Sequence, residues 1–86
     1  MATSTWLTRA YPDLFAGLTE HDALDITAAV DNNVLEGWEP TRDDIAILTA
    51  EARGAISRDD LLRQARGEIT RAELVQMALR GVTAAT

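Results

Sequence analysis

The feature that most constrains the fold is a helix-start phrase that occurs three times in the second half of the chain. It reads TRDDI at 41–45, SRDDL at 57–61 and TRAEL at 70–74. A hydroxyl residue followed three positions later by an acid is typical of a helix N-terminus, where both groups bond free backbone N–H groups. Each phrase leads into an apolar stretch that closes with Arg-Gly, a common helix end. We therefore predict helices at about 42–53, 58–66 and 71–80, and a C-terminal tail at 82–86.

The glycines of the three Arg-Gly pairs are predicted to end these helices; they are Gly54, Gly67 and Gly81. Upstream, Thr19 followed by Asp22 predicts the start of a longer helix at about 20–36. Its apolar positions recur at helical spacing and are expected to pack on the core; they are Ala23, Ile26, Val30 and Val34.

The first seventeen residues hold three of the four aromatic side chains, around Pro12. They predict an N-terminal arm or short helix at 1–17, ahead of a helical domain at 18–81. No segment alternates between apolar and polar residues with a period of two, so strands are not expected. The predicted fold class is all-α, a small bundle of about four helices.

Length and charge narrow the function classes. The chain has 86 residues, enough for one small domain, and no cysteine. No apolar run approaches the roughly 20 residues that cross a membrane, and no signal peptide is recognisable, so a cytoplasmic location is expected.

The net charge is −6, with eight basic and fourteen acidic residues. Nucleic-acid binding depends on basic side chains, so it is not expected, whereas a basic site on a protein partner suits this charge.

Nothing in the sequence predicts catalysis. His21 is the single histidine, and no cysteine or second histidine could share a metal with it. The acid pairs at 43–44 and 59–60 each fall in a first helical turn, where the helix dipole explains them. No phosphate-binding loop, catalytic triad or metal-ligand spacing is present. We expect a non-enzyme that has no cofactor and no metal site.

The segment NNVLEGWEP, at 32–40, conflicts with the rules for a stable helix end. Asn32 and Asn33 are poor helix formers, and Glu36 puts a negative charge at the carbonyl end of the helix dipole. Gly37 can end the helix with a left-handed cap. Asn32 and Glu36 lie four residues apart, so they share one face, nearly opposite the core stripe. Such conflicts gather at functional sites, although an ordinary solvated helix end also accounts for them.

The stretch at 32–64 resembles the VbhA-like antitoxins, which inhibit Fic-domain toxins. Their inhibitory helix carries [Ser/Thr]-x-x-x-Glu-[Gly/Asn], followed by a proline-containing turn, a second helix, a Gly-Glu/Lys-Ile-Ser/Thr turn and a third helix. Here Glu36 and Gly37 match the motif, Pro40 matches the turn, and RGAIS at 53–57 matches the second connection. Asn32 stands where the family has Ser or Thr. The resemblance covers roughly residues 14–66.

The resemblance implies a function. Fic enzymes transfer AMP from ATP to protein hydroxyls, and the motif glutamate pairs with the active-site arginine that binds the γ-phosphate of ATP. It follows that Glu36 would inhibit AMP transfer, supported by Asn32 and Gly37. Asn33, Leu35 and Trp38 are expected to contact the Fic-domain partner, together with Ile47, which is expected to project away from Ile45 and Leu48.

Two other functions are compatible with the residues. The chain could be a non-enzymatic interaction module or adaptor with a different partner. It could also be a transcriptional regulator, although its acidity argues against DNA binding. For Trp38, the alternative to partner binding is a hydrophobic contact that folds back on the helix end.

Overall fold

Five α-helices make up the regular structure of residues 5–85, which are the residues that the computed structural model describes. They are α1 (Trp6–Ala10), α2 (Glu20–Leu35), α3 (Arg42–Arg53), α4 (Arg58–Ala65) and α5 (Arg71–Ala85). No strand occurs among these residues, so the predicted all-α bundle is confirmed. The segment predicted as an arm or short helix contains the short helix α1, followed by turns that lead into α2.

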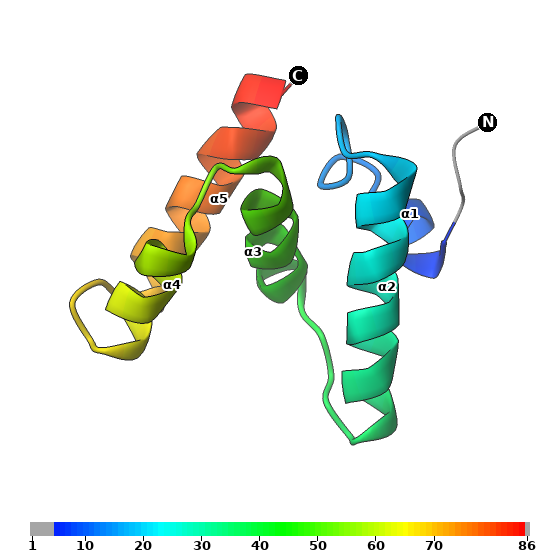
Figure 1. The fold of residues 1–86 in the computed structure, drawn as a ribbon, viewed down its shortest axis with the longest axis horizontal. Coiled ribbons are helices and arrows are strands. Elements are labelled where there is room, and N and C mark those ends of the chain that lie inside the picture. The colour runs from blue at the N-terminus through cyan, green and yellow to red at the C-terminus, as the bar shows by residue number, and fades with distance from the viewer. Residues whose placement is uncertain (1–4, 86) are drawn as a thin grey trace.

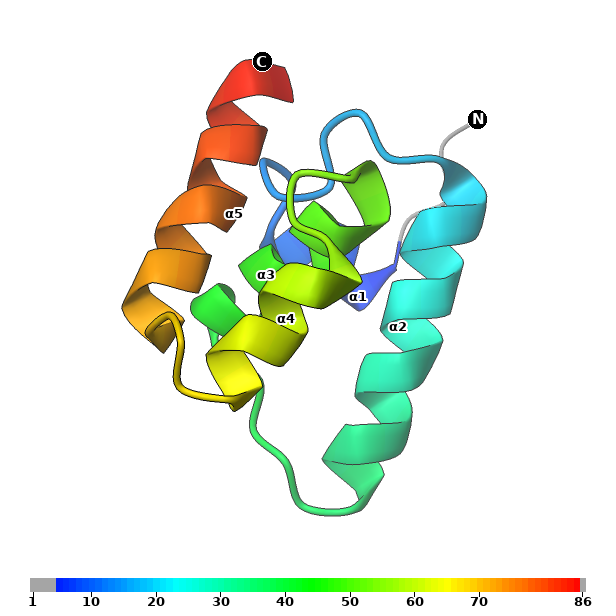
Figure 2. The same ribbon diagram turned by 60° about the vertical axis from the view of Figure 1, so that its left-hand side comes forward.

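Helix α3 lies at the centre of the bundle, between α2 on one side and α5 on the other (Figures 1 and 2). Helix α4 packs on α5, and α1 packs on α2. The molecule is flat, with principal extents of 40, 33 and 17 Å. In Figure 1, α2 and α5 diverge from the centre, so α3 is the element that joins the two halves of the bundle.

The central position of α3 explains why a broad face of this helix is buried. Its buried side chains are Ile45, Ala46, Ile47, Thr49 and Ala50. Thr49 is fully buried, and its hydroxyl donates to the carbonyls of Ile45 at 3.0 Å and Ala46 at 3.1 Å. The expectation that Ile47 projects away from the core is wrong: only 8% of it is exposed. Ile47 belongs to the face of α3 that the neighbouring helices cover, so it does not point outward to a partner.

The three repeated start phrases all form the predicted caps. Thr41 and Asp44 exchange hydrogen bonds at the start of α3, and Ser57 and Asp60 do so at the start of α4. Before α5, the Glu73 carboxylate accepts from the Thr70 backbone N–H at 3.1 Å, and the Thr70 hydroxyl accepts from the Glu73 N–H at 3.0 Å. Local hydrogen bonding therefore fixes each helix start, as the sequence predicted.

The third Arg-Gly pair does not end its helix. Gly54 has φ +80° and closes α3, as predicted, but α5 runs through Gly81 to Ala85. The predicted end at residue 80 and the predicted tail from 82 are therefore wrong for residues up to 85. A side chain at position 81 has no room, because its Cβ would overlap with the Cβ of Ala55. Gly81 lets α5 lie against the α3–α4 turn.

Arg53 ties the N-terminal segment to the end of α3. Its Nη2 donates to the carbonyl of Leu14 at 2.6 Å and to that of Ala16 at 2.9 Å. Arg42, at the other end of α3, forms an ion pair with Asp13. Both ends of the central helix thus hold the turns that precede α2, and this sets the position of α2 against α3.

The contact between Gly81 and Ala55 can be tested with a double-mutant cycle. Alanine is favoured over glycine in a helix by about 1 kcal/mol, whereas overlap in a packed site costs about 1–3 kcal/mol. We expect Gly81→Ala to lower the free energy of unfolding by up to about 2 kcal/mol, measured by urea unfolding followed by circular dichroism.

The matched background is Ala55→Gly, which removes the methyl group that a Cβ at position 81 would meet. In that background Gly81→Ala should stabilise the protein by up to about 1 kcal/mol, the helix-propensity term alone. If Gly81→Ala has the same sign in both backgrounds, the close approach of α5 to the turn does not explain the glycine.

Candidate functional site

The C-terminal end of α2 has a fixed backbone. The N–H of Trp38 donates to the carbonyl of Asn33, and the N–H of Gly37 donates to that of Val34, both at 3.0 Å. Gly37 has φ +97°, which a side chain would strain. Together these bonds form a Schellman motif with Glu36 as the C-cap, so the predicted glycine cap is confirmed.

The side chains at this end of α2 point into solvent. Leu35 is 86% exposed, and Asn32 and Glu36 are exposed as well. Within residues 5–85 the Glu36 carboxylate and the Asn32 amide make no hydrogen bond or ion pair, not even with each other. Glu36 is therefore an unpaired carboxylate beside an exposed leucine, on a backbone that Gly37 holds in place.

The core face of α2 differs from the predicted stripe. Ala23, Thr27 and Val30 are buried, whereas Val34 is 40% exposed. Thr27 fits the core because its hydroxyl donates to the carbonyl of Ala23 at 2.7 Å. Val34 was expected in the core and is not, because the last turn of α2 extends beyond the N-terminus of α3.

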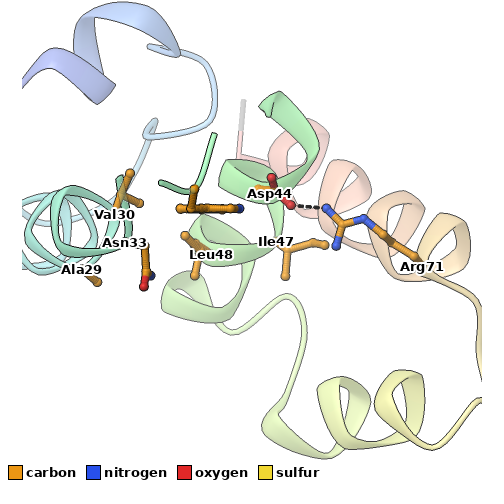
Figure 3. A pocket seen from close by; sticks show the side chains of 8 residues that line it. Ala29, Val30, Asn33, Asp44, Ile47, Leu48 and Arg71 are labelled. Atoms are coloured by element: carbon orange, nitrogen blue, oxygen red, sulfur yellow. Dashed lines mark hydrogen bonds and ion pairs between the residues drawn. The ribbon is translucent and has the colours of Figure 1, made fainter. Parts of the chain in front are cut away.

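Trp38 is half-buried and packs against the core just after the Gly37 cap. Together with Asn33 it lines a hollow of about 290 Å³ between α2, α3 and α5. This is the folded-back position that the alternative interpretation of Trp38 described. The other side chains around the hollow are Ala29, Val30, Asp44, Ile47, Leu48 and Arg71 (Figure 3).

Four of the residues predicted to contact a partner or to form the motif line one opening. These are Asn33, Glu36, Gly37 and Trp38. Ile47 lies in the neighbouring hollow with Asn33 and Trp38, but as part of its buried floor. Asn32 and Leu35 line neither space. The structure thus brings the predicted residues to one end of α2, with Ile47 beneath them.

The hollow contains one ion pair that sequence reasoning missed. Asp44 of α3 accepts from the guanidinium of Arg71 at the start of α5 (Figure 3). In the sequence both residues belong to start phrases and were interpreted only as parts of caps. Burial raises the pKa of Asp44, but hydrogen bonds from Thr41 and the pairing with Arg71 outweigh it, so the net pKa lies below its usual value.

No group of three or more His, Cys, Asp and Glu side chains within residues 5–85 is arranged to hold a metal ion. Among the helices that the structure describes, none has the length and apolar character needed to cross a membrane.

Comparisons with protein-family models, with curated proteins and with solved structures found no match to this chain. The assignment of a function therefore depends on the residues of α2 and their surroundings.

Asp44 offers a pH test of the structure around the hollow. Asp44→Ala removes the carboxylate that accepts from Thr41 and pairs with Arg71, whereas the backbone N–H of residue 44 still donates to the Thr41 hydroxyl. We expect the variant to lower the free energy of unfolding by about 1–2 kcal/mol at pH 7. Because the folded-state pKa is below the usual value, this stabilisation is present at neutral pH and is lost as the pH falls through the folded-state pKa. The difference from wild type should shrink as the pH falls below the usual pKa of an aspartate, in urea unfolding measured across pH.

Asp43→Ala is the matched control, since Asp43 is the exposed neighbour in the same first turn. It should cost only the dipole contribution of about 0.3–1 kcal/mol. Equal losses in the two variants, or an Asp44 effect that persists in acid, would contradict the role given to Asp44.

Proposed function

We propose that this chain is a non-enzymatic antitoxin that binds a Fic-domain AMP-transferase in the cytoplasm and inhibits AMP transfer. The observation that carries the proposal is the exposed, unpaired carboxylate of Glu36 on a capped helix end. This end has the sequence that resembles the inhibitory motif of the VbhA-like antitoxins.

An arginine of the partner would explain why a glutamate lies at the carbonyl end of α2. In the free chain the carboxylate lies beside the carbonyl end of α2, which disfavours it. Against an arginine it would form a charge-assisted pair, worth about 1.5–3 kcal/mol. A γ-phosphate excluded from that arginine would also lose the alignment that the transfer step requires.

The neighbours of Glu36 suit binding of a protein surface. Leu35 is 86% exposed and Val34 is 40% exposed, so the tip of α2 presents apolar area beside the carboxylate. Asn32 is exposed one turn earlier and has no partner among residues 5–85, so its amide is available to the same arginine or to the partner backbone. In this proposal the affinity comes from the helical surface and the inhibition from Glu36.

A binding module with a different partner is the second candidate. The open hollows beside α2 favour it, because they could receive a partner without any role for Glu36. The two candidates differ in the partner that is recovered: a protein with a Fic motif supports the first, and another stoichiometric partner supports the second.

Glu36→Gln tests the inhibitory mechanism, because it removes the charge and keeps the size of the side chain. The assay is transfer of labelled AMP from ATP to protein by the Fic-domain enzyme encoded beside this gene or elsewhere in the same genome. We expect the variant to stay in complex while AMP transfer rises about ten- to hundredfold, the equivalent of one charge-assisted pair.

Glu39→Gln is the matched control, since Glu39 is an exposed carboxylate three residues further on. It should inhibit as the wild type does. Full inhibition by Glu36→Gln would rule out the ion-pair mechanism, and failure to bind any Fic-domain enzyme would rule out the antitoxin.

A further inference from the structure

A groove runs between α2 and α3 on the side that the core does not fill. One hollow, of about 290 Å³, reaches from Val30 and Asn33 to α5, and a second, of about 330 Å³, reaches toward the start of α2. Both are lined by Ala29 and Leu48, so the two hollows meet there. Figure 3 shows Ala29 and Asn33 on one side and Leu48 on the other.

The walls of this groove follow helical periodicity. On α2 the lining residues recur three and four positions apart from Asp22 to Asn33, and on α3 they do so from Asp44 to Ala52. Each series is one face of a helix. The α2 wall is about 16 Å long at 1.5 Å per residue, a length that matches about three turns of a second helix.

The floor of the groove is apolar and shallow. Ala29 and Ala52 have small side chains, and Ile26 and Leu48 are half-buried beside them. Small side chains allow another backbone to approach closely. Apolar side chains that are buried against an apolar floor contribute favourable free energy of binding. A helix that lays its apolar face into a groove uses this arrangement.

The rim is negatively charged. Asp22 and Asp25 come from α2 and Glu51 from α3, and no basic side chain lines this end of the groove. The Asp25 carboxylate lies 3.1 Å from Nε2 of His21. The carboxylates of Asp22 and Glu51 have no hydrogen-bond or ion-pair partner among residues 5–85. These like charges repel across the groove, and a cationic side chain between them would relieve that repulsion.

We infer that the groove between α2 and α3 binds a cationic amphipathic helix of another protein. Its apolar residues would contact Ala29 and Leu48, and its Lys or Arg side chains would reach Asp22, Asp25 and Glu51. A second copy of this chain is disfavoured as the occupant, because each copy has a net charge of −6. The inference does not depend on the proposed function, since its test contains no Fic-domain enzyme.

The probe is a synthetic 15-residue amidated peptide of Leu, Ala and Lys, with Leu at positions three and four apart. Trp38 lines the groove, and Trp6→Phe leaves it as the sole tryptophan. In the Trp6→Phe chain we expect the peptide to shift Trp38 emission in a saturable way, and the affinity to fall as salt is raised from about 0.05 to 0.5 M. Scrambled peptide and a peptide with Glu in place of Lys should give no saturable shift.

Ala29→Arg and Ala28→Arg form a matched pair, both exposed on α2 and each adding one positive charge. Only position 29 lines the groove. We expect Ala29→Arg to weaken peptide binding at least about tenfold and Ala28→Arg to change it by less than about twofold, with circular dichroism confirming that both are folded.

The inference is overturned if the Lys peptide does not bind, if the scrambled or Glu peptide binds as well, or if the two arginine variants bind alike. It is also overturned if sedimentation equilibrium finds a dimer of this chain that Ala29→Arg dissociates, because the groove would then hold a second copy.

Discussion

The fold depends on the burial of α3 on opposite sides at once. A helix can be packed in this way only if it has a broad apolar face, and α3 supplies isoleucines, alanines and a threonine whose hydroxyl bonds its own backbone. Its remaining side, with Glu51 and Ala52, stays open. Helix α5 packs on one side and α2 on the other. Because α3 is only twelve residues long, α2 extends beyond it, and the last turn of α2 is left without core contacts. The exposed tip is thus a geometric result of the short central helix.

Helix starts and most helix ends could be predicted because their causes are local. A hydroxyl, an acid three residues later and a glycine act through hydrogen bonds within one turn, so the sequence contains all the partners. Gly81 shows the limit of this approach. Its sequence context matches that of Gly54, yet its role is set by Ala55, which approaches from a different part of the chain. No local pattern distinguishes a glycine that ends a helix from one that makes room for a neighbour.

The site was predictable to a similar extent. Glu36 and Gly37 were found because they break or satisfy local rules, and the structure has both at the end of α2. Ile47 and Val34 were assigned to the wrong environments, because burial depends on which helices are neighbours. The pairing of Asp44 with Arg71 had no separate signal, since both residues also belong to cap phrases. The groove between α2 and α3 was missed for the same reason: it exists only once two helices lie beside each other.

The Schellman motif at the end of α2 has a consequence for the entropy of binding. A flexible loop that carried a recognition carboxylate would lose about 1–2 kcal/mol of backbone freedom for each residue that is ordered on binding. Here two hydrogen bonds, from Gly37 and Trp38, already fix the backbone on which Glu36 lies. What remains to be ordered is largely the glutamate side chain, about 1.5–2 kcal/mol. A partner that meets this tip therefore meets a preorganised group, and most of the interaction energy is available as affinity.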